Sequence, residues 1–402
     1  MNLLFVADGR SPTARSWIIN IQKDGHRVTF ITTYPCQELP GLAGFHTLPV
    51  AFSRFTSRGG SPNIPHTKYN LTRQLINALR PNLLNLRYTL GPLTLPFYQN
   101  KFLKIVDRIG PDLIHALRIP FEGMLAKSAP ARYPLVISIW GNDLTLHANG
   151  SYNMGKVTHN TLSRADGLMA DTNRDIRLAK NWGFRNQLPS LVVPGCGGLD
   201  IEEINTARSL SPKRLLELIP SSNHLVINPR GLRPGSLRTD IFFKAARIVS
   251  AKHPDVCFLC PTMAGQSEAL RYIARYKLER NVILLPSLTQ PELWWLFAQS
   301  EMIISPGVHD GVPNSLLEAL ASGCYPIAGD IESIREWITP GVNGLLYPPT
   351  DASAFAESIS LILENPDRRY DAARYNLNLI RERADQSIIR KKISDFYQNM
   401  AG

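Results

Sequence analysis

Short, β-rich apolar runs alternate with helical stretches along the chain, and no other sequence feature constrains the fold as strongly. In the first half the runs cover residues 3–7, 27–32, 113–116, 135–139, 167–170 and 191–193. In the second half they cover residues 224–228, 256–260, 282–285, 302–305 and 325–328, with helical stretches such as 242–250 and 355–364 between them. Strands that alternate with helices predict parallel sheets that are covered by helices on both faces.

The length of the chain predicts two domains. At 402 residues the chain is too long for one compact core, and the alternating pattern occurs twice. We therefore expect an α/β fold of two doubly wound, Rossmann-like domains that face each other across a cleft, with ligands at the carboxyl ends of the strands. The polar, proline-containing stretch 209–222 predicts the boundary, which gives domains of residues 1–212 and 213–380 and a C-terminal helix over 381–402 that packs back on the first domain. The Pro-, Gly- and Asn-rich stretch 52–100 predicts a loop and irregular helices over one end of the first sheet.

The composition is that of an ordinary globular protein, with 44% apolar and 19% charged residues. No apolar run approaches the roughly 18 residues that span a bilayer, and the sequence begins with a buried strand instead of a basic leader, so we expect a cytoplasmic protein. The five cysteines are scattered and odd in number, which argues against a disulfide framework. Cys257 and Cys260 form a C-x-x-C, but no second ligand pair follows at zinc-finger spacing, so we expect core cysteines and no metal site.

Positive charge is concentrated in the first half of the chain. The net charge is +11; residues 1–215 carry 25 Lys and Arg against 13 Asp and Glu, and the remainder carries 19 against 20. Between Glu38 and Asp107 there is no acidic residue, and the basic residues there are Arg54, Arg58, Lys68, Arg73, Arg80, Arg87, Lys101 and Lys104. Such a field attracts an anionic partner. Two interpretations stay open, a solubilising surface or contact with an anionic acceptor or with anionic lipid at the inner face of the membrane. Nucleic acid is not an expected partner because no nucleic-acid-binding motif accompanies the charge.

The segment 304–330 carries the strongest functional pattern in the sequence. After a strand, a loop carries Asp310, a helix begins near Pro313, and Gly323 stands where a helix C-terminus favours positive φ. The N-terminus of this helix presents free N–H groups and a partial positive charge, which suits a phosphate or sugar oxygens. Asp310 on the loop and Glu318 on the helix can therefore face one cavity, near the two ends of an extended ligand.

This segment resembles the acidic motif of the family 4 retaining glycosyltransferases, which have the GT-B fold. That motif has the form E-G-F-G-L-P-x-L-E-A-M-A-x-G, and residues 310–323 read D-G-V-P-N-S-L-L-E-A-L-A-S-G, with Asp in place of the first Glu. The resemblance implies that Glu318 binds the ribose hydroxyls of a nucleotide and that Asp310 contacts the donor sugar near the reacting carbon. It also implies that backbone groups after Asp310 bind sugar hydroxyls and phosphate. These residues are Gly311, Val312, Pro313, Asn314 and Ser315.

A second match to the family lies after the first strand of the second half, in residues 224–246. The family has an arginine there and, a few residues later, a lysine, which together bind the donor diphosphate; Arg230 and Arg238 are the best equivalents. Bidentate guanidinium groups suit phosphate oxygens and would stabilise the departing nucleoside diphosphate. For Arg233, which lies between them, a phosphate contact and a solvated loop both stay open.

The loop after the first strand departs from the family. Residues 8–17 read DGRSPTARSW where many members have a Gly-Gly loop. By the resemblance, Gly9, Arg10 and Ser11 would line the acceptor side. The additional arginines Arg10 and Arg15 would favour an anionic acceptor.

A second departure lies in residues 138–148. Trp140 stands where many members carry the histidine of a His-Gly pair. A tryptophan cannot exchange a proton but can stack on a sugar face, so we expect Trp140 on the acceptor side. For Asp143 two roles stay open, a catalytic role in orienting substrate hydroxyls or the capping of a turn.

The resemblance implies a glycosyltransferase that moves a hexose-type sugar from a UDP or GDP sugar, or another nucleotide sugar, to a glycan, lipid-linked or small-molecule acceptor with retention of configuration. In this family retention is explained by attack from the leaving-group face, where the departing phosphate helps to remove the acceptor's proton. No metal or other cofactor is expected, since arginines replace the cation. Two rivals stay open, a sugar-nucleotide epimerase or hydrolase on the same fold and a catalytically weak nucleotide-sugar-binding scaffold. A nicotinamide dehydrogenase is not expected because no G-x-G-x-x-G follows the first strand.

Overall fold

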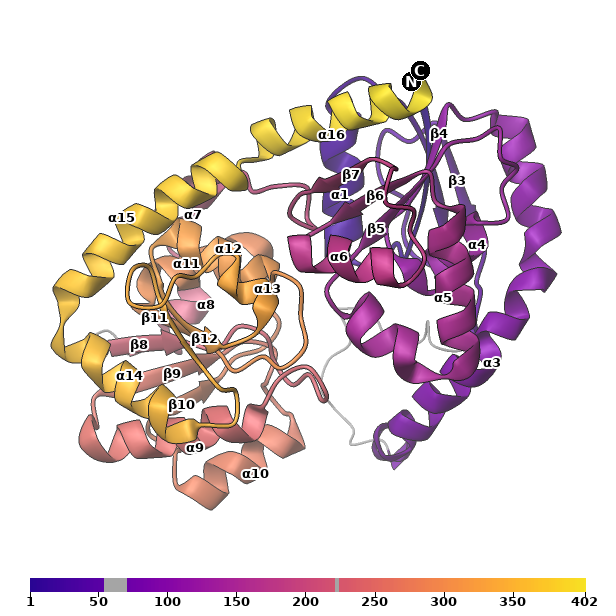
Figure 1. The fold of residues 1–402 in the computed structure, drawn as a ribbon. Helices are drawn as coiled ribbons and strands as arrows, with labels where there is room; N and C mark the ends of the chain where they lie inside the picture. Colours follow the sequence, from indigo (N-terminus) through magenta and orange to yellow (C-terminus); the bar gives the residue numbers. More distant parts are fainter. Residues whose placement is uncertain (54–70, 221–223) are drawn as a thin grey trace. The chain divides into compact units, whose positions relative to one another are not determined.

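The chain forms two α/β units, each built around one parallel sheet (Figure 1). The computed structural model describes residues 1–53, 71–220 and 224–402. Unit 1 comprises Met1–Gly197 and Arg390–Gly402, and unit 2 comprises Gly198–Ile389. The expectation of two doubly wound α/β domains is confirmed.

Unit 1 contains a seven-stranded sheet in the order β3-β2-β1-β4-β5-β6-β7. Its strands are β1 (Asn2–Ala7), β2 (Arg27–Thr32), β3 (Gly44–Thr47), β4 (Leu113–Ala116), β5 (Leu135–Ile139), β6 (Gly167–Ala170) and β7 (Ser190–Val192). The chain adds strands outward from β1 to β3 and then continues on the other side of β1 with β4. The strand order therefore reverses between β1 and β4, and at such a reversal the loops after the two strands diverge and leave room for a ligand.

The helices of unit 1 are α1 (Pro12–Gln22), α3 (Leu71–Ile109), α4 (Met124–Ala126), α5 (Tyr152–Arg164), α6 (Asn173–Asn181) and most of α16 (Gln386–Ala401), with the short turns η2 (Ile119–Gly123), η3 (Asp143–His147) and η4 (Ala148–Gly150). Two of these helices begin at serine caps. Ser11 accepts a hydrogen bond from the Ala14 amide at 3.3 Å, and Ser151 accepts one from the Met154 amide at 3.1 Å. Such caps satisfy N–H groups that have no partner inside the helix.

The long helix α3 replaces the loop and irregular helices that the composition of residues 52–100 predicts. It has 39 residues and runs along one side of unit 1 (Figure 1). Its second half buries Leu95, Phe102 and Val106 in the core of the unit. This packing outweighs the low helix propensity of the prolines and glycine within the helix. The remainder of the expectation, with Arg54, Arg58 and Lys68, lies outside the described residues, as do the side chains of Arg73 and Arg80.

Unit 2 contains a six-stranded sheet in the order β10-β9-β8-β11-β12-β13. Its strands are β8 (His224–Ile227), β9 (Val256–Cys260), β10 (Val282–Leu284), β11 (Met302–Ser305), β12 (Tyr325–Gly329) and β13 (Leu345–Tyr347). Its helices are α7 (Ile201–Ala207), α8 (Lys213–Leu216), α9 (Thr239–Lys252), α10 (Ser267–Tyr276), α11 (Gln290–Gln299), α12 (Asn314–Ser322), α13 (Glu332–Arg335), α14 (Ala352–Glu364) and α15 (Pro366–Arg383). The strand order reverses between β8 and β11, so the loops after these two strands form the expected binding edge of this unit.

The boundary between the units lies at Gly197 and Gly198, earlier than the expected division between residues 212 and 213. Helix α7 lies before the polar stretch but belongs to unit 2, because it packs against α11 and α12 and buries Ile201 and Ile204. Leu199 then pairs with the segment before α16, where its amide donates to the Ala384 carbonyl at 2.7 Å. A polar, proline-containing stretch marks a loop, but it does not reveal on which core the preceding helix packs.

The C-terminal helix α16 returns to unit 1 through a buried hydrogen-bond network. The Tyr397 hydroxyl lies 2.6 Å from His115 Nδ1 and accepts a hydrogen bond from the Trp17 indole at 3.3 Å. On the other side of its ring, His115 contacts the Ser138 hydroxyl at 2.8 Å. Burial lowers the pKa of His115 to about 3, so the ring is neutral and its two nitrogens serve this network as one donor and one acceptor.

We expect Tyr397→Phe to destabilise unit 1 by about 1–3 kcal/mol, because it leaves the buried Trp17 indole N–H and His115 Nδ1 without a hydrogen-bond partner. Chemical denaturation followed by tryptophan fluorescence measures this difference. Tyr152→Phe is the control, since Tyr152 is 82% exposed in the same unit. Equal stabilities of the two variants would contradict a structural role for the network.

Candidate functional site

Two residues that the sequence singled out meet at the strand reversal of unit 2. Arg230 follows β8, Asp310 follows β11, and their side chains form an ion pair. Only 8% of the Arg230 side chain and 16% of the Asp310 side chain are exposed. The carbonyl of Asp310 also accepts a hydrogen bond from the Ser333 hydroxyl at 2.8 Å. Asp310 is thus fixed at two points, since Arg230 pairs with its carboxylate and Ser333 binds its backbone carbonyl.

The loops after β8 and β11 are fastened to each other by backbone hydrogen bonds. The Arg238 amide donates to the Pro306 carbonyl at 3.0 Å, and the Val308 amide donates to the Ser236 carbonyl at 2.9 Å. Behind them, Gly329 lies so close to Gly307 that a Cβ at position 329 would stand 2.2 Å from the Gly307 carbonyl oxygen. Only glycine fits there, and its absence of a side chain lets the end of β12 support the loop that carries Asp310.

Helix α12 begins directly after this loop. Pro313 precedes its first turn, which contains no acidic residue and has no side-chain cap. Gly311, Val312 and Pro313 are buried, and Asn314 and Ser315 are half-buried. The partial positive charge of this helix N-terminus is therefore available near the ion pair.

Glu318 lies on α12 and is 8% exposed. Gln290, the first residue of α11, donates a hydrogen bond from Nε2 to Glu318 Oε1 at 3.0 Å, and the Trp294 side chain faces the same carboxylate. Burial raises the pKa of Glu318 to about 7, and these neighbours offset only part of that effect. A buried carboxylate with one fixed donor retains acceptor capacity for ligand hydroxyl groups.

The arginines of the β8 loop make contacts that differ from those that the sequence predicts. Arg238 forms a bidentate contact with Asp240, with Nε and Nη2 each 2.8 Å from a carboxylate oxygen. Arg233 instead donates from Nε to the Arg230 carbonyl at 3.2 Å and lies close enough to interact with the charges of Arg230 and Asp310. Arg233 is therefore a closer neighbour of the ion pair than the sequence indicated.

In unit 1, the loop after β1 contains the residues expected on the acceptor side. Gly9 is buried, and a Cβ there would stand 2.3 Å from Cys36 Sγ, so its small size serves packing. Arg10 is partly exposed and contacts Asp8 with two nitrogens, the closer at 2.9 Å. Ser11 caps α1. Arg15 donates to the Gln37 carbonyl at 2.9 Å, which fixes it to the backbone instead of a ligand.

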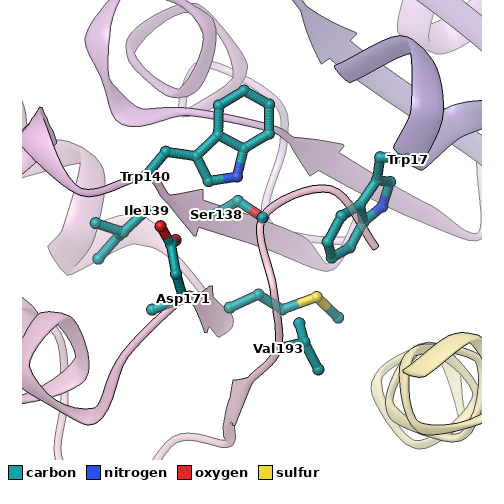
Figure 2. Close-up of a pocket in the computed structure, with 9 residues that line it drawn as sticks. Trp17, Ser138, Ile139, Trp140, Asp171 and Val193 are labelled. Carbon is teal, nitrogen blue, oxygen red and sulfur yellow. The ribbon is translucent and has the colours of Figure 1, made fainter. Parts of the chain in front are cut away.

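Trp140 borders a small hollow at the carboxyl ends of β5, β6 and β7 (Figure 2). The indole rings of Trp17 and Trp140 lie on either side of Ser138, and the Asp171 carboxylate lies near Trp140. The space in the hollow, about 130 Å³ with open solvent included, leaves no room for a water-sized sphere, whereas typical small-molecule pockets hold roughly 300–1,000 Å³. The hollow is therefore a shallow depression that does not enclose a sugar.

Asp143 is fully buried beside this hollow. Its Oδ1 accepts a hydrogen bond from Arg118 Nε at 2.9 Å, and its Oδ2 accepts from the amides of Ile119 and Trp140 at 3.2 and 3.4 Å. Both oxygens therefore hold the loops after β4 and β5 together. This geometry corresponds to the capping alternative for Asp143.

The described residues contain no group of three or more His, Cys, Asp or Glu side chains that could hold a metal ion. Cys257 and Cys260 lie on β9 with both side chains buried, and burial raises the pKa of Cys257 to about 11. A thiol with such a pKa stays protonated and is a poor nucleophile or ligand.

Several site residues carried no sequence signal. Gln290 and Trp294 reach Glu318 from another helix, and Ser333 reaches the Asp310 loop from α13. Their positions depend on how the helices pack, which no local pattern encodes. The resemblance to a family motif covered only the residues that lie within the motif itself.

Part of unit 2 is similar to a known family of enzymes. Residues 238–378 match the model of the family described as glycosyl transferases group 1. A D-inositol 3-phosphate glycosyltransferase of Pseudarthrobacter chlorophenolicus is 23% identical over 54% of this chain, and the chain spans about half of that relative, 52% of its length. A GDP-mannose:cellobiosyl-diphosphopolyprenol alpha-mannosyltransferase of Xanthomonas campestris is 23% identical over 65% of this chain and 67% of the relative.

A solved structure has the same fold. The structure of HepE of Anabaena in complex with UDP-glucose aligns with 99% of this chain and 99% of its own, with a TM-score of 0.71 and 19% sequence identity. At this identity the likeness establishes only the arrangement of strands and helices. The ligands of this chain have to be inferred from its own residues. The family match, for its part, includes both acids of the motif, Asp310 and Glu318.

We expect Glu318→Gln to stabilise unit 2 more at pH 8 than at pH 5. The pKa of Glu318 in the folded protein, about 7, lies above that of an unfolded chain, so stability falls as the pH rises through this interval and the full cost is present above it. Removing the charge raises the free energy of unfolding by on the order of 1–3 kcal/mol at pH 8 and by little below pH 5. Thermal unfolding of both proteins across this pH range measures the difference, and a pH-independent offset would contradict the assignment.

Proposed function

We propose that this chain, a member of the group 1 glycosyltransferases with the GT-B fold, transfers a hexose-type sugar from a nucleotide-sugar donor to an acceptor. The observation that carries the proposal is the position of Arg230, Asp310 and Glu318 at the strand reversal of unit 2. Ligands of doubly wound sheets bind at this point. The chemistry of the three side chains matches the charged diphosphate, the sugar and the ribose of such a donor.

Glu318 is the proposed ribose ligand. Its carboxylate accepts hydrogen bonds from the two ribose hydroxyls, and Gln290 holds it in position. Because the carboxylate is buried, oxygen lone pairs without a hydrogen-bond donor cost free energy. A nucleotide whose ribose supplies two hydroxyl donors removes that cost. UDP and GDP sugars both fit this role because they share the ribose.

Arginines and the α12 N-terminus are the proposed diphosphate site. Arg230 and Arg233 lie next to each other on the β8 loop, and the N-terminus of α12, which has no side-chain cap, follows the loop that carries Asp310. Arg238 contributes through Nη1, since Asp240 occupies its Nε and Nη2. These positive groups offset the charge that develops on the leaving nucleoside diphosphate, and the proposal needs no metal or other cofactor.

Retention of configuration is part of the proposal. The Asp310 carboxylate is engaged by Arg230, so it orients the sugar and steadies positive charge on its ring but is not free to attack the reacting carbon. The acceptor oxygen then attacks from the side of the departing phosphate, and a phosphate oxygen takes its proton. Catalysis on this route rests on positioning and charge stabilisation.

Unit 1 is the proposed acceptor unit. Gly9 and Ser11 shape the loop after β1, and Trp140 offers an indole face beside the hollow for stacking on a sugar. Asp143 acts as a positioning residue that fixes Trp140 and the η2 turn. The acceptor class is a glycan or a lipid-linked sugar. The Xanthomonas relative, named as a mannosyltransferase that acts on a diphosphopolyprenol-linked sugar, supports the second.

One face of α3 supports contact with an anionic membrane. Four apolar side chains at helical spacing point away from the core, with Phe97 84% and Leu93 56% exposed and Leu86 and Leu90 also exposed. The same face continues with the exposed residues Lys101, Lys104 and Arg108. An apolar stripe that runs into a basic one matches the acyl chains and anionic head groups of a bilayer surface.

This contact is peripheral. None of the helices in the described parts of the chain combines the length and apolarity that crossing a membrane requires. The proposal keeps the cytoplasmic location expected from the sequence, with α3 at the inner face of the membrane, where a lipid-linked acceptor would be within reach.

We expect Asp310→Asn to lower kcat/KM for sugar transfer by about 100-fold or more, since it removes the charge that faces the reacting sugar and leaves Arg230 buried without a partner. Release of the nucleoside diphosphate from a panel of nucleotide sugars measures the rate. Asp330→Asn is the matched control, because it removes the carboxylate of the more exposed ion pair with Arg335.

NMR of the product tests the stereochemistry in the same reaction. The anomeric configuration of the donor sugar is expected to persist, and an inverted product would contradict the proposed route. Conversion of the donor at the same rate with and without acceptor would instead indicate a hydrolase or epimerase.

We expect a Leu93→Ser, Phe97→Ser variant to lose at least about tenfold in affinity for vesicles, because it removes two exposed apolar side chains. Co-sedimentation with phosphatidylcholine vesicles that do or do not contain phosphatidylglycerol measures binding. Tyr152→Ser is the control, since it removes an equally exposed aromatic side chain from unit 1. Binding that depends neither on these residues nor on anionic lipid would contradict a membrane role for α3.

A further inference from the structure

A cluster of arginines and aromatic rings occupies the strand reversal of unit 1, the position that Arg230 and Asp310 occupy in unit 2. Asp8 and Arg10 follow β1, Tyr34 follows β2, and Arg118 follows β4. Strand order reverses between β1 and β4, so these side chains stand where a doubly wound sheet binds its ligand. None of them takes part in the proposed donor site of unit 2.

Two guanidinium groups share one aromatic ring in this cluster. The guanidinium carbon of Arg10 lies 3.4 Å from the centroid of the Tyr34 ring, and that of Arg87 lies 5.2 Å from the same centroid. Arg87 also lies over the Phe121 ring, at 4.6 Å. Both rings are 4% exposed, while Arg10 over the Tyr34 ring is partly exposed.

The backbone at Phe121 has an unusual conformation. Phe121 has a φ of 69°, a left-handed value that costs a non-glycine residue about 1 kcal/mol or more. Its ring also lies against Gly91, where a Cβ would stand 2.8 Å from Phe121 Cε1. The position of the Phe121 ring beside Arg87 therefore depends on a strained backbone at Phe121 and on a glycine within α3.

The charges of the cluster do not balance. Arg10 has Asp8 as its partner, and Arg118 has Asp143. Within the described parts of the chain Arg87 has no carboxylate partner, and its buried Nε makes no hydrogen bond. Glu122, on the turn after β4, is buried, accepts a hydrogen bond from Thr33 at 2.6 Å and has a pKa raised by burial to about 7. The site therefore retains positive charge and unused N–H donors.

We propose that Arg87 and Arg10 bind a phosphate or diphosphate group of the acceptor. Guanidinium groups bind phosphate oxygens with two parallel hydrogen bonds, and an anion between Arg10 and Arg87 removes the repulsion between two like charges that share one ring. The assignment of this anion to the acceptor rests on the proposed function. The anion site itself lies wholly within unit 1. The same chemistry fits a free phosphorylated acceptor and a lipid-linked diphosphate.

The test measures binding of inorganic pyrophosphate to the full chain by isothermal titration calorimetry, with saturating nucleoside diphosphate present to occupy unit 2. Arg87→Gln is expected to weaken this binding by about tenfold or more, the loss of one charge-assisted contact. Arg27→Gln is the matched control, because it removes an exposed arginine at the opposite, amino end of the same sheet. No binding to the wild type, or equal binding by the Arg87→Gln variant, would overturn the proposal.

A second probe distinguishes the two sources of phosphate. Farnesyl diphosphate that binds more tightly than pyrophosphate, with the same dependence on Arg87, indicates a lipid-linked acceptor. Binding of both at equal strength indicates a free phosphorylated acceptor.

Failure of the donor proposal has a separate readout. If no nucleoside diphosphate binds, the titration is repeated without it and with Arg230→Gln added. Pyrophosphate binding that is lost in Arg87→Gln and kept in Arg230→Gln then supports the anion site in unit 1 although the proposed function has failed. Loss in Arg230→Gln alone would place the anion in unit 2 and overturn this inference.

Discussion

The ion pair between Arg230 and Asp310 is the interaction on which the proposed donor site depends. Both side chains are more than four-fifths buried, and removing one partner of such a pair leaves the other charged group without compensation, at a cost of about 3–5 kcal/mol. The pair joins the loops after β8 and β11, which diverge because the strand order reverses between them. Unit 2 therefore has an ordered arginine and an ordered carboxylate at its binding edge before any ligand arrives.

Both units carry charged side chains at the strand reversal of their sheet, but the two sets of side chains differ. In unit 2 the reversal point carries arginines, an acid and a helix N-terminus, and Glu318 lies on the helix behind them. In unit 1 the equivalent edge carries Arg10 and Arg87 over aromatic rings. Because sheet topology fixes where the loops diverge, the side chains on those loops decide which ligand each unit takes.

The sequence predicted what local patterns encode. The runs at residues 256–260 and 302–305 match β9 and β11 residue for residue, and Gly323 has the positive φ, 93°, expected at a helix end. Helix α3 was missed because its prolines and glycine oppose helix formation and only packing against the core reveals it. Likewise, Arg238 was one of the two best equivalents of the family's basic pair, but Asp240 two residues away is its partner. The position of Arg87 near the ring that Arg10 covers depends on where α3 lies.

The central claim, that unit 2 binds the nucleotide of a sugar donor through Glu318, is tested most directly by thermal shift with UDP, GDP, ADP and their sugar conjugates. The account predicts that one nucleotide family raises the melting temperature of the wild type and of the control Glu357→Ala, which removes an exposed glutamate of the same unit, but not that of Glu318→Ala. No shift with any nucleotide, or an undiminished shift in Glu318→Ala, would contradict the claim.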